Sequence, residues 1–359
     1  MLSTLTRPLF RRLPLPLISP RPRSLHLAPP FLIDPPYLPA YLTLPQSSTP
    51  LKRALVNSHL ANCNLCPRLC GVNRYQTNGL CLTGATHVTV NTIAPHFGEE
   101  PCIQGHNGSG AVFFSNCNLR CVFCQNYDIS HPHSKKTGFD LTPEELAQWM
   151  VKLQEVGKVH NINLVTPEHV VPQVALAILE ARDMGLTVPI VYNTSSYDSL
   201  QSLRLLDGLV DIYLADFKVW KPETARRLLK AEDYPLAARE SVKRMWEQVG
   251  DLCFTPDGIA RRGLLVRHLV MPGLEEESGE IMKYLAEEVS RDCFVNIMEQ
   301  YRPDAHVGKP SKKKEGGQER YAEINRPVRK EEVSSVRRAA EEAGLWRFCD
   351  PPGHDGFNI

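Results

Sequence analysis

Short apolar runs alternate with longer amphipathic stretches through the middle of the chain. The stretch at 142–156 begins with Thr142, Pro143 and two glutamates, which is typical of a helix start, and the stretch at 172–185 ends at Gly185, a common helix terminator. The apolar runs predict six strands, at 110–115, 161–165, 188–193, 210–218, 263–273 and 294–301.

Strands that alternate with helices indicate βαβ units and a parallel sheet. The six predicted strands lie between residues 110 and 301, whereas a complete eight-stranded barrel needs about 250 residues. We therefore expect an α/β fold built on a partial (β/α)6 barrel of parallel strands with a cysteine-rich N-terminal extension. A doubly wound sheet would fit the same pattern.

The first residues of the chain differ in composition from the rest. Residues 1–33 contain five arginines and no lysine, aspartate or glutamate, which is typical of a transit peptide, although their prolines oppose a long helix. We expect a mitochondrial protein; the alternative is a disordered tail on a cytoplasmic one. The segments expected are 1–50 (transit peptide or tail), 51–104 (cysteine-rich extension), 105–302 (barrel), 303–322 (flexible loop) and 323–359 (C-terminal helical segment).

Charge and hydropathy narrow the classes of partner. The formal net charge is +1 and 23% of residues are charged, which disfavours nucleic acid, and a basic cluster within 307–320 reads more simply as a surface loop. No apolar run approaches the length of a membrane span.

Seven of the 11 cysteines fall into two tight groups, which favours metal or redox chemistry over a disulfide framework. Cys117, Cys121 and Cys124 follow the first predicted strand directly, at the strand end where ligands bind in parallel α/β folds. Three thiolates can hold a [4Fe–4S] cluster and leave one iron open for a ligand. Phe123 could cover that cluster or pack near an adenine. The alternative is a zinc site with a fourth ligand from the upstream group.

The stretch "CNLRCVFCQN" (117–126) resembles the signature of radical S-adenosylmethionine (SAM) enzymes. With "NLVTPEH", "YNTSSY", "DIYLADFK", "GLLVRHLVMPG" and "NIMEQYRP", the chain is similar over about residues 60–350 to the pyruvate formate-lyase activating enzyme-like branch. The resemblance implies SAM and a [4Fe–4S] cluster as cofactors, and an electron donor such as a flavodoxin or ferredoxin. It also implies a 5′-deoxyadenosyl radical that abstracts hydrogen, with a protein glycine as one conceivable target.

The same resemblance implies SAM-binding roles at other strand ends. Glu168 matches the acid of a Gly-Gly-Glu segment whose glycines are replaced here, and a carboxylate at a helix start is the alternative. Asn193 stands where relatives carry an acid. Asp216 and Lys218 match an Asp-x-Lys pair, with a structural ion pair as the alternative, and Arg267 matches an arginine that can grip the ligand carboxylate. His268, on the opposite face of its strand, is expected to be a packed histidine.

The upstream cysteines, spaced C-x2-C-x3-C-x10-C, stay open between a structural metal site, a second cluster and no metal; they are Cys63, Cys66, Cys70 and Cys81. The rival to an enzyme is a non-enzymatic iron–sulfur protein that transfers electrons or assembles clusters. Such a protein would need no ligand pocket at the strand ends.

Overall fold

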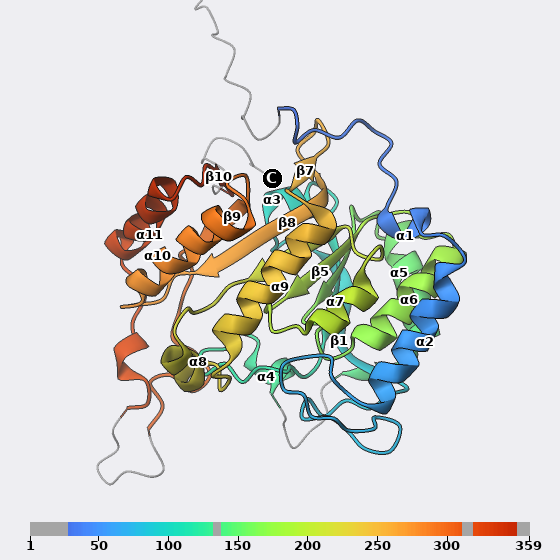
Figure 1. Cartoon of the computed structure of the whole chain (residues 1–359), viewed down its shortest axis with the longest axis horizontal. Coiled ribbons are helices and arrows are strands. Elements are labelled where there is room, and N and C mark those ends of the chain that lie inside the picture. Colours follow the sequence, from blue (N-terminus) through green and yellow to red (C-terminus); the bar gives the residue numbers. More distant parts are fainter. Residues whose placement is uncertain (1–27, 132–137, 311–318, 350–359) are drawn as a thin grey trace, which may run out of the picture.

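The computed structural model describes residues 28–131, 138–310 and 319–349. A curved sheet forms its centre (Figure 1). The strands of this sheet follow the order β10-β9-β8-β6-β5-β4-β2-β1-β3. Six consecutive strands of this sheet are parallel, so the predicted partial (β/α)6 barrel is confirmed. These strands are β2 (Ser109–Phe114), β4 (Ile162–Val165), β5 (Ile190–Thr194), β6 (Ile212–Asp216), β8 (Ala260–Leu269) and β9 (Phe294–Met298).

Strands outside the predicted six extend the sheet at both edges. β1 (Val88–His96) pairs antiparallel with β2, and β3 (Phe139–Leu141) pairs with β1. At the other edge, β10 (Arg347–Phe348) pairs parallel with β9. Off the main strand order, β7 (Cys253–Phe254) forms a short antiparallel pair with β8. The segment after β1 comes back toward β9, so the two edge regions face each other across the open side of the barrel.

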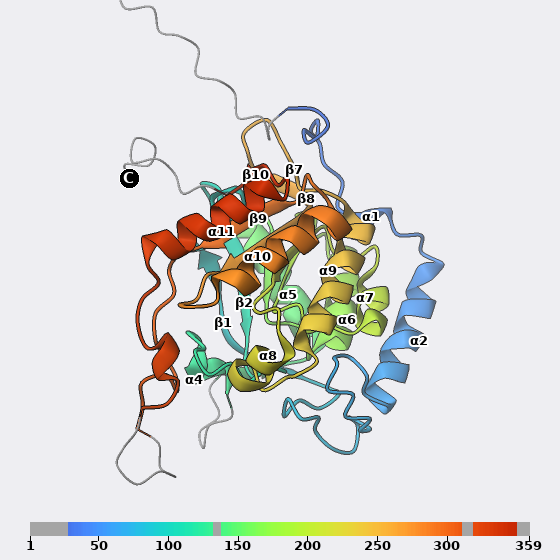
Figure 2. The same cartoon turned by 60° about the vertical axis from the view of Figure 1, so that its left-hand side comes forward.

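Helices cover the outer side of the curved sheet (Figures 1 and 2). α5 packs on α6, α6 on α7, α7 on α9, and α10 on α11, which also contacts β9. Thr142 caps α5 in a reciprocal capping box with Glu145, as the sequence predicts. The helices are α5 (Pro143–Glu155), α6 (Val171–Asp183), α7 (Leu200–Leu206), α8 (Pro222–Leu228), α9 (Tyr234–Val249), α10 (Glu275–Tyr284) and α11 (Lys330–Glu342).

Four further helices lie in the connecting segments: α1 (Ala40–Thr43), α2 (Ser48–Ala61), α3 (Pro101–Gln104) and α4 (Tyr127–Ser130). A π-helical turn (Leu285–Val289) continues α10, and a 3-10 turn (Ala322–Ile324) precedes α11. No helix of the described part of the chain has the length and apolar character that crossing a bilayer requires.

The N-terminal boundary differs from the expected one, because residues 28–50 pack on the barrel. Phe31 and Tyr41 are buried, and the backbone of residues 31–33 hydrogen-bonds to Phe254. The buried carboxylate of Asp211 accepts hydrogen bonds from the Tyr37 hydroxyl and the Ala40 N–H, each at 2.7 Å. The folded chain therefore begins before residue 51. Residues 1–27, which carry most of the predicted targeting signal, lie outside the described residues, as do 311–318 of the predicted loop.

Candidate functional site

A cavity of about 280 Å³ lies at the carboxyl ends of the parallel strands. The loop after β2 supplies one wall, and the ends of β4, β5, β6 and β8 supply the others. All but one of the predicted site residues line it: Cys117, Cys121, Phe123, Cys124, Asn193, Asp216, Lys218 and Arg267. The strand-end rule for parallel folds thus brings together residues that are far apart in the sequence.

The three cysteines occupy one side of this cavity. The N–H of Leu119 donates to Cys117 Sγ at 3.3 Å, and Cys124 Sγ lies 3.2 Å from the Ser130 hydroxyl. Burial raises the pKa of the Cys121 thiol to about 12, although the nearby Lys218 ammonium opposes this shift. A neutral thiol in such surroundings becomes a thiolate only when a cation or a metal centre compensates its charge.

This donor set fits an iron–sulfur cube better than a single ion. Within the described ranges, no three cysteine, histidine or carboxylate side chains converge as ligands of one metal ion. The corners of a four-iron cube hold their thiolates farther apart than one ion does, so three thiols that share a cavity wall suit a cluster. The rest of the wall combines charged and polar side chains with apolar ones such as Val165, Leu269 and Met298, which suits a ligand that has both charged and apolar parts.

Asp216 and Lys218 form an ion pair at the end of β6. Lys218 Nζ donates to Asp216 Oδ2 at 2.7 Å, and the two side chains are 20% and 19% exposed. Burial alone would raise the pKa of Asp216, but the Arg267 and Lys218 cations outweigh it and hold this pKa below its usual value. Asp216 is therefore a fixed anion on the cavity wall.

Arg267, on β8, is the hub of the polar wall. Its Nε donates to Asp216 Oδ1 at 2.7 Å, and its Nη2 donates to Asn193 Oδ1 at 2.6 Å. Its Nη1 lies 3.4 Å from Glu99 Oε2 and 4.0 Å from Glu100 Oε1. Three of its N–H groups are thus used within the chain, so this guanidinium orders the wall in addition to any contact with a ligand carboxylate.

Glu168 takes a position that neither sequence interpretation anticipated. Its carboxylate is fully buried and accepts hydrogen bonds from the Thr194 hydroxyl, at 3.0 Å, and the Ser195 hydroxyl, at 2.6 Å. It therefore braces the loop after β5 instead of lining the cavity or capping α6. Thr166, which stands at one of the replaced glycines, has φ of 60° and lines the cavity.

His268 is a packed histidine, as expected from its place on the opposite face of the strand. Its Nδ1 lies 2.7 Å from the Phe217 carbonyl oxygen and its Nε2 lies 2.8 Å from the Ser278 hydroxyl. Burial lowers the pKa of His268 from its usual 6.5 to about 4.

The lowered pKa of His268 predicts a pH dependence of stability. Below pH 6.5 His268 becomes protonated in the unfolded chain but stays neutral in the folded chain. The contribution of His268 to the free energy of unfolding therefore falls by about 2 kcal/mol as the pH decreases from 6.5 to 5. The stability advantage of the wild type over His268→Gln should therefore shrink by that amount, as measured by denaturant unfolding at pH 7.5 and 5. An advantage that stays constant would contradict this prediction.

The upstream cysteines form a separate group in the irregular segment 62–87, which follows α2 in the chain. Cys63, Cys66 and Cys81 are buried, and the Arg74 guanidinium lies among the thiols, with Nη2 3.3 Å from Cys81 Sγ. No member of this group lines the main cavity, so it supplies no fourth ligand there. Zinc and iron analysis of a chain lacking Cys117, Cys121 and Cys124 tests whether this group holds metal.

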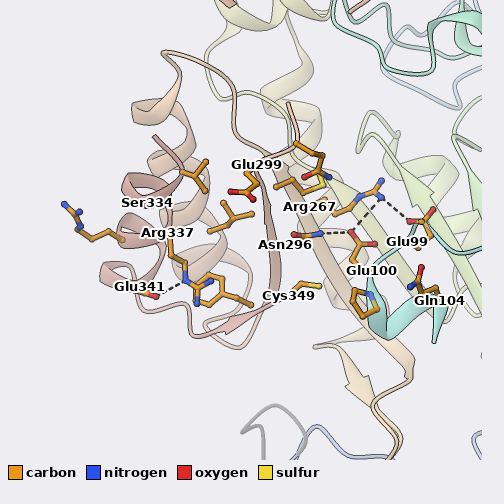
Figure 3. A pocket seen from close by; sticks show the side chains of 18 of the residues that line it. Glu99, Glu100, Gln104, Arg267, Asn296, Glu299, Ser334, Arg337, Glu341 and Cys349 are labelled. Carbon is orange, nitrogen blue, oxygen red and sulfur yellow. Dashed lines mark hydrogen bonds and ion pairs between the residues drawn. The ribbon is translucent and has the colours of Figure 1, made fainter. Parts of the chain in front are cut away.

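A second, larger cavity of about 890 Å³, named here the side chamber, adjoins the first one at Arg267, Met298 and Gln300. It occupies the open side of the barrel, between the segment after β1, the end of β9, and α11 (Figure 3). Glu99 reaches Arg267 there, and Asn296 Nδ2 donates to Glu100 Oε1 at 2.8 Å. These two contacts tie the β1 edge of the barrel to β8 and β9.

Sequence reasoning missed Glu99, Glu100 and Asn296. Burial raises the pKa of Glu99 to about 6, against the opposing influence of Arg267. The available signal was the doublet "EEP" at 99–101, but it follows a strand that was not predicted, so nothing indicated where these acids lie.

Comparison with known proteins gives one family match. Residues 111–285 match the model described as the radical SAM superfamily. An uncharacterized protein from Methanocaldococcus jannaschii is 29% identical over 305 residues, which cover 84% of this chain and 80% of that protein.

Two solved structures are distant likenesses. SuiB from Streptococcus suis is 10% identical with a TM-score of 0.38, and the match covers 64% of this chain but only 43% of SuiB. A domain of pyruvate-formate lyase-activating enzyme from Bacteroides vulgatus is 9% identical with a TM-score of 0.34, covering 49% of this chain and 87% of that domain.

Proposed function

From the match of residues 111–285 to the model of the radical SAM superfamily, we propose that this protein is an enzyme that cleaves SAM reductively and abstracts hydrogen from a substrate. The main structural support for this proposal is that Cys117, Cys121 and Cys124 line the same cavity as polar side chains from the ends of several different strands. A [4Fe–4S] cluster held by these three cysteines would supply the single electron for the reductive cleavage of SAM, which yields methionine and, with a hydrogen atom from the substrate, 5′-deoxyadenosine.

The chain's own residues hold and orient the ligand in this proposal. The three cysteines bind the cluster, and Asp216, a fixed anion, accepts hydrogen bonds from the ammonium group of SAM. Lys218 and the remaining N–H groups of Arg267 face the ligand's carboxylate, while Asn193 adds a neutral acceptor. Phe123, which is 6% exposed, closes the cysteine side of the cavity against water.

The rival is a non-enzymatic iron–sulfur protein. A carrier of electrons needs a cluster close to the surface but no ordered ligand wall, whereas here Asp216, Asn193 and Glu99 are all held by one arginine. Removing the several charges of this ligand wall from water is unfavourable. Their presence therefore favours a role in which the wall binds a charged ligand. A flavodoxin or ferredoxin then fits as the electron donor.

The finer proposal concerns the branch and the target. The resemblance of the motifs points to the pyruvate formate-lyase activating enzyme-like branch, in which the hydrogen would come from a backbone glycine of a second protein. The side chamber favours a different target, a small molecule, because it leads to the cavity from the open side of the barrel.

Anaerobic reconstitution tests the proposal directly. The full chain, loaded with iron and sulfide and given dithionite and SAM, should form 5′-deoxyadenosine and methionine in equal amounts, detected by liquid chromatography. Omission of the reductant is the control and should abolish both products. A chain with a full cluster that yields neither product would refute the enzyme proposal and leave the non-enzymatic iron–sulfur alternative.

A further inference from the structure

The side chamber has an unsatisfied acceptor at its inner end. Glu100 Oε1 accepts from Asn296, but Glu100 Oε2 is buried without a hydrogen-bond partner in the described part of the chain, and the side chain is 4% exposed. Gln104 Oε1, one turn of α3 farther on, is buried and unpaired in the same sense. Both side chains line the chamber (Figure 3). A buried carboxylate oxygen without a donor is unfavourable, so a ligand that supplies a donor at this end of the chamber would relieve that cost.

The charge balance around Glu100 indicates which donor. Three carboxylates lie around the single guanidinium of Arg267: Glu100 is buried, Glu99 and Asp216 are partly buried, and Lys218 compensates only Asp216. One negative charge is therefore in excess. Burial also raises the pKa of Glu99 to about 6; the Arg267 cation opposes this shift and the neighbouring Glu100 carboxylate adds to it.

SAM does not account for this excess by itself. Its cationic groups would lie in the cavity lined by the cysteines, Asn193 and Asp216, whereas Glu100 and Gln104 line only the side chamber. The two spaces meet at Arg267, Met298 and Gln300. A second ligand in the chamber would thus present one end to Glu100 and another part to the site of radical chemistry.

The rest of the chamber suits an organic molecule with an apolar body. Its volume of about 890 Å³ lies in the usual range for small-molecule pockets. Beside the charged groups, its walls carry the apolar side chains of Phe97, Ile297, Met298, Val333 and Phe348. A hydrocarbon portion would pack there while a charged end reaches the acids near α3.

We propose that the side chamber is the substrate site and that it takes a small molecule with an ammonium group on an apolar body, anchored at Glu100 Oε2 and Gln104 Oε1. Calling the ligand a substrate rests on the proposed function. Binding of the ligand in the side chamber can be measured without any turnover.

The test uses the reconstituted full chain with SAM and the probe n-hexylammonium, followed by anaerobic isothermal titration calorimetry. Hexylammonium should bind, whereas n-hexanol and n-hexanoate, which have the same chain, should bind at least about tenfold more weakly, since a hydrogen bond to a charged group contributes 1.5 kcal/mol or more. Equal binding of the three probes would overturn the proposal.

Matched variants locate the site. Glu100→Gln keeps the acceptor for Asn296 but puts an N–H₂ group in place of Oε2, so hexylammonium should bind about tenfold more weakly. Gln104→Glu adds a second carboxylate and should strengthen binding, which keeps the test decisive should Glu100→Gln fold poorly. Glu288→Gln makes the same chemical change at an exposed carboxylate paired with Lys243 and should leave binding unchanged. Unchanged affinity in both chamber variants would refute the site.

The two proposals fail separately. If the chain forms 5′-deoxyadenosine but binds hexylammonium and hexanol equally, the enzyme proposal is supported and the ligand site in the side chamber is refuted. If the chain binds hexylammonium through Glu100 but never cleaves SAM, the ligand site in the side chamber is supported and the enzyme proposal is refuted.

Discussion

Replacing Cys121 by alanine is expected to abolish the [4Fe–4S] signal and to lower 5′-deoxyadenosine formation by about three orders of magnitude or more, because loss of a cluster thiolate removes the electron source itself. Cys121 lies on the cavity wall with Cys117 and Cys124, and the three have no spare thiol in that cavity. The remaining two thiols cannot hold three corners of the cube. The measurements are the visible absorbance and the electron paramagnetic resonance spectrum of the anaerobically reconstituted chain, together with product analysis.

Cys293→Ala is the matched control for this change. Cys293 is 1% exposed and packs in the core, so its replacement removes the same sulfur atom without touching the cavity. It should cost some stability, as core truncations do, and leave the cluster spectrum intact. An unchanged spectrum in Cys121→Ala would refute the ligand assignment, and a lost spectrum in both variants would point to misfolding instead.

The barrel was predictable because its strands are buried on both faces. Parallel strands such as "INLV" and "IVYNT" are nearly continuous apolar runs, and each is followed by a helix with clear start and stop residues. β1 was missed because "VTVNTIAPH" is an antiparallel strand with a largely half-exposed pattern, and its apolar positions do not form a run. The two-residue strands β7 and β10 carry no periodic signal at all.

The site was predictable only where motif positions coincide with strand ends. Lys218 and Asp216 are two residues apart, so their shared face follows from strand geometry. Glu99 and Arg267 are 168 residues apart, and their contact depends on how the barrel's open side is closed. No local pattern encodes that closure. Glu168 was placed by its motif, yet the hydroxyls of Thr194 and Ser195 turn it toward the β5 loop.

The N-terminal boundary shows how composition can mislead. An acid-free, proline-rich beginning suggested a tail through residue 50, but Tyr41 is fully buried and its hydroxyl donates to the Val188 carbonyl oxygen. The Tyr37 hydroxyl and the Ala40 N–H also hold this segment, and the carboxylate that accepts from both, Asp211, lies far along the chain.

Replacing Arg267 by methionine is expected to destabilise the folded chain by about 3–5 kcal/mol, because it leaves buried carboxylates without their shared cation. Methionine keeps much of the apolar stem, so lost packing adds little. Arg267 contacts Asp216 at 2.7 Å and Glu99 at 3.4 Å, and it is 16% exposed, so solvent replaces little of its charge. Glu99→Gln in the Arg267→Met background should recover part of the loss, because it removes one of the stranded charges. Denaturant unfolding at pH 7.5 measures each step.

The pH dependence distinguishes lost charge from lost packing. In the wild type, Arg267 and Lys218 lower the pKa of Asp216, so Asp216 adds stability above its unfolded pKa of about 4 and loses it as pH falls through the folded value. In Arg267→Met the folded pKa values of Asp216 and of Glu99, already about 6, rise, so these acids take up protons more readily in the folded chain. The stability gap between wild type and variant should therefore narrow as pH falls from 7.5 to 5. A gap that is flat over this range would assign the loss to packing and refute Arg267 as the electrostatic hub of the site.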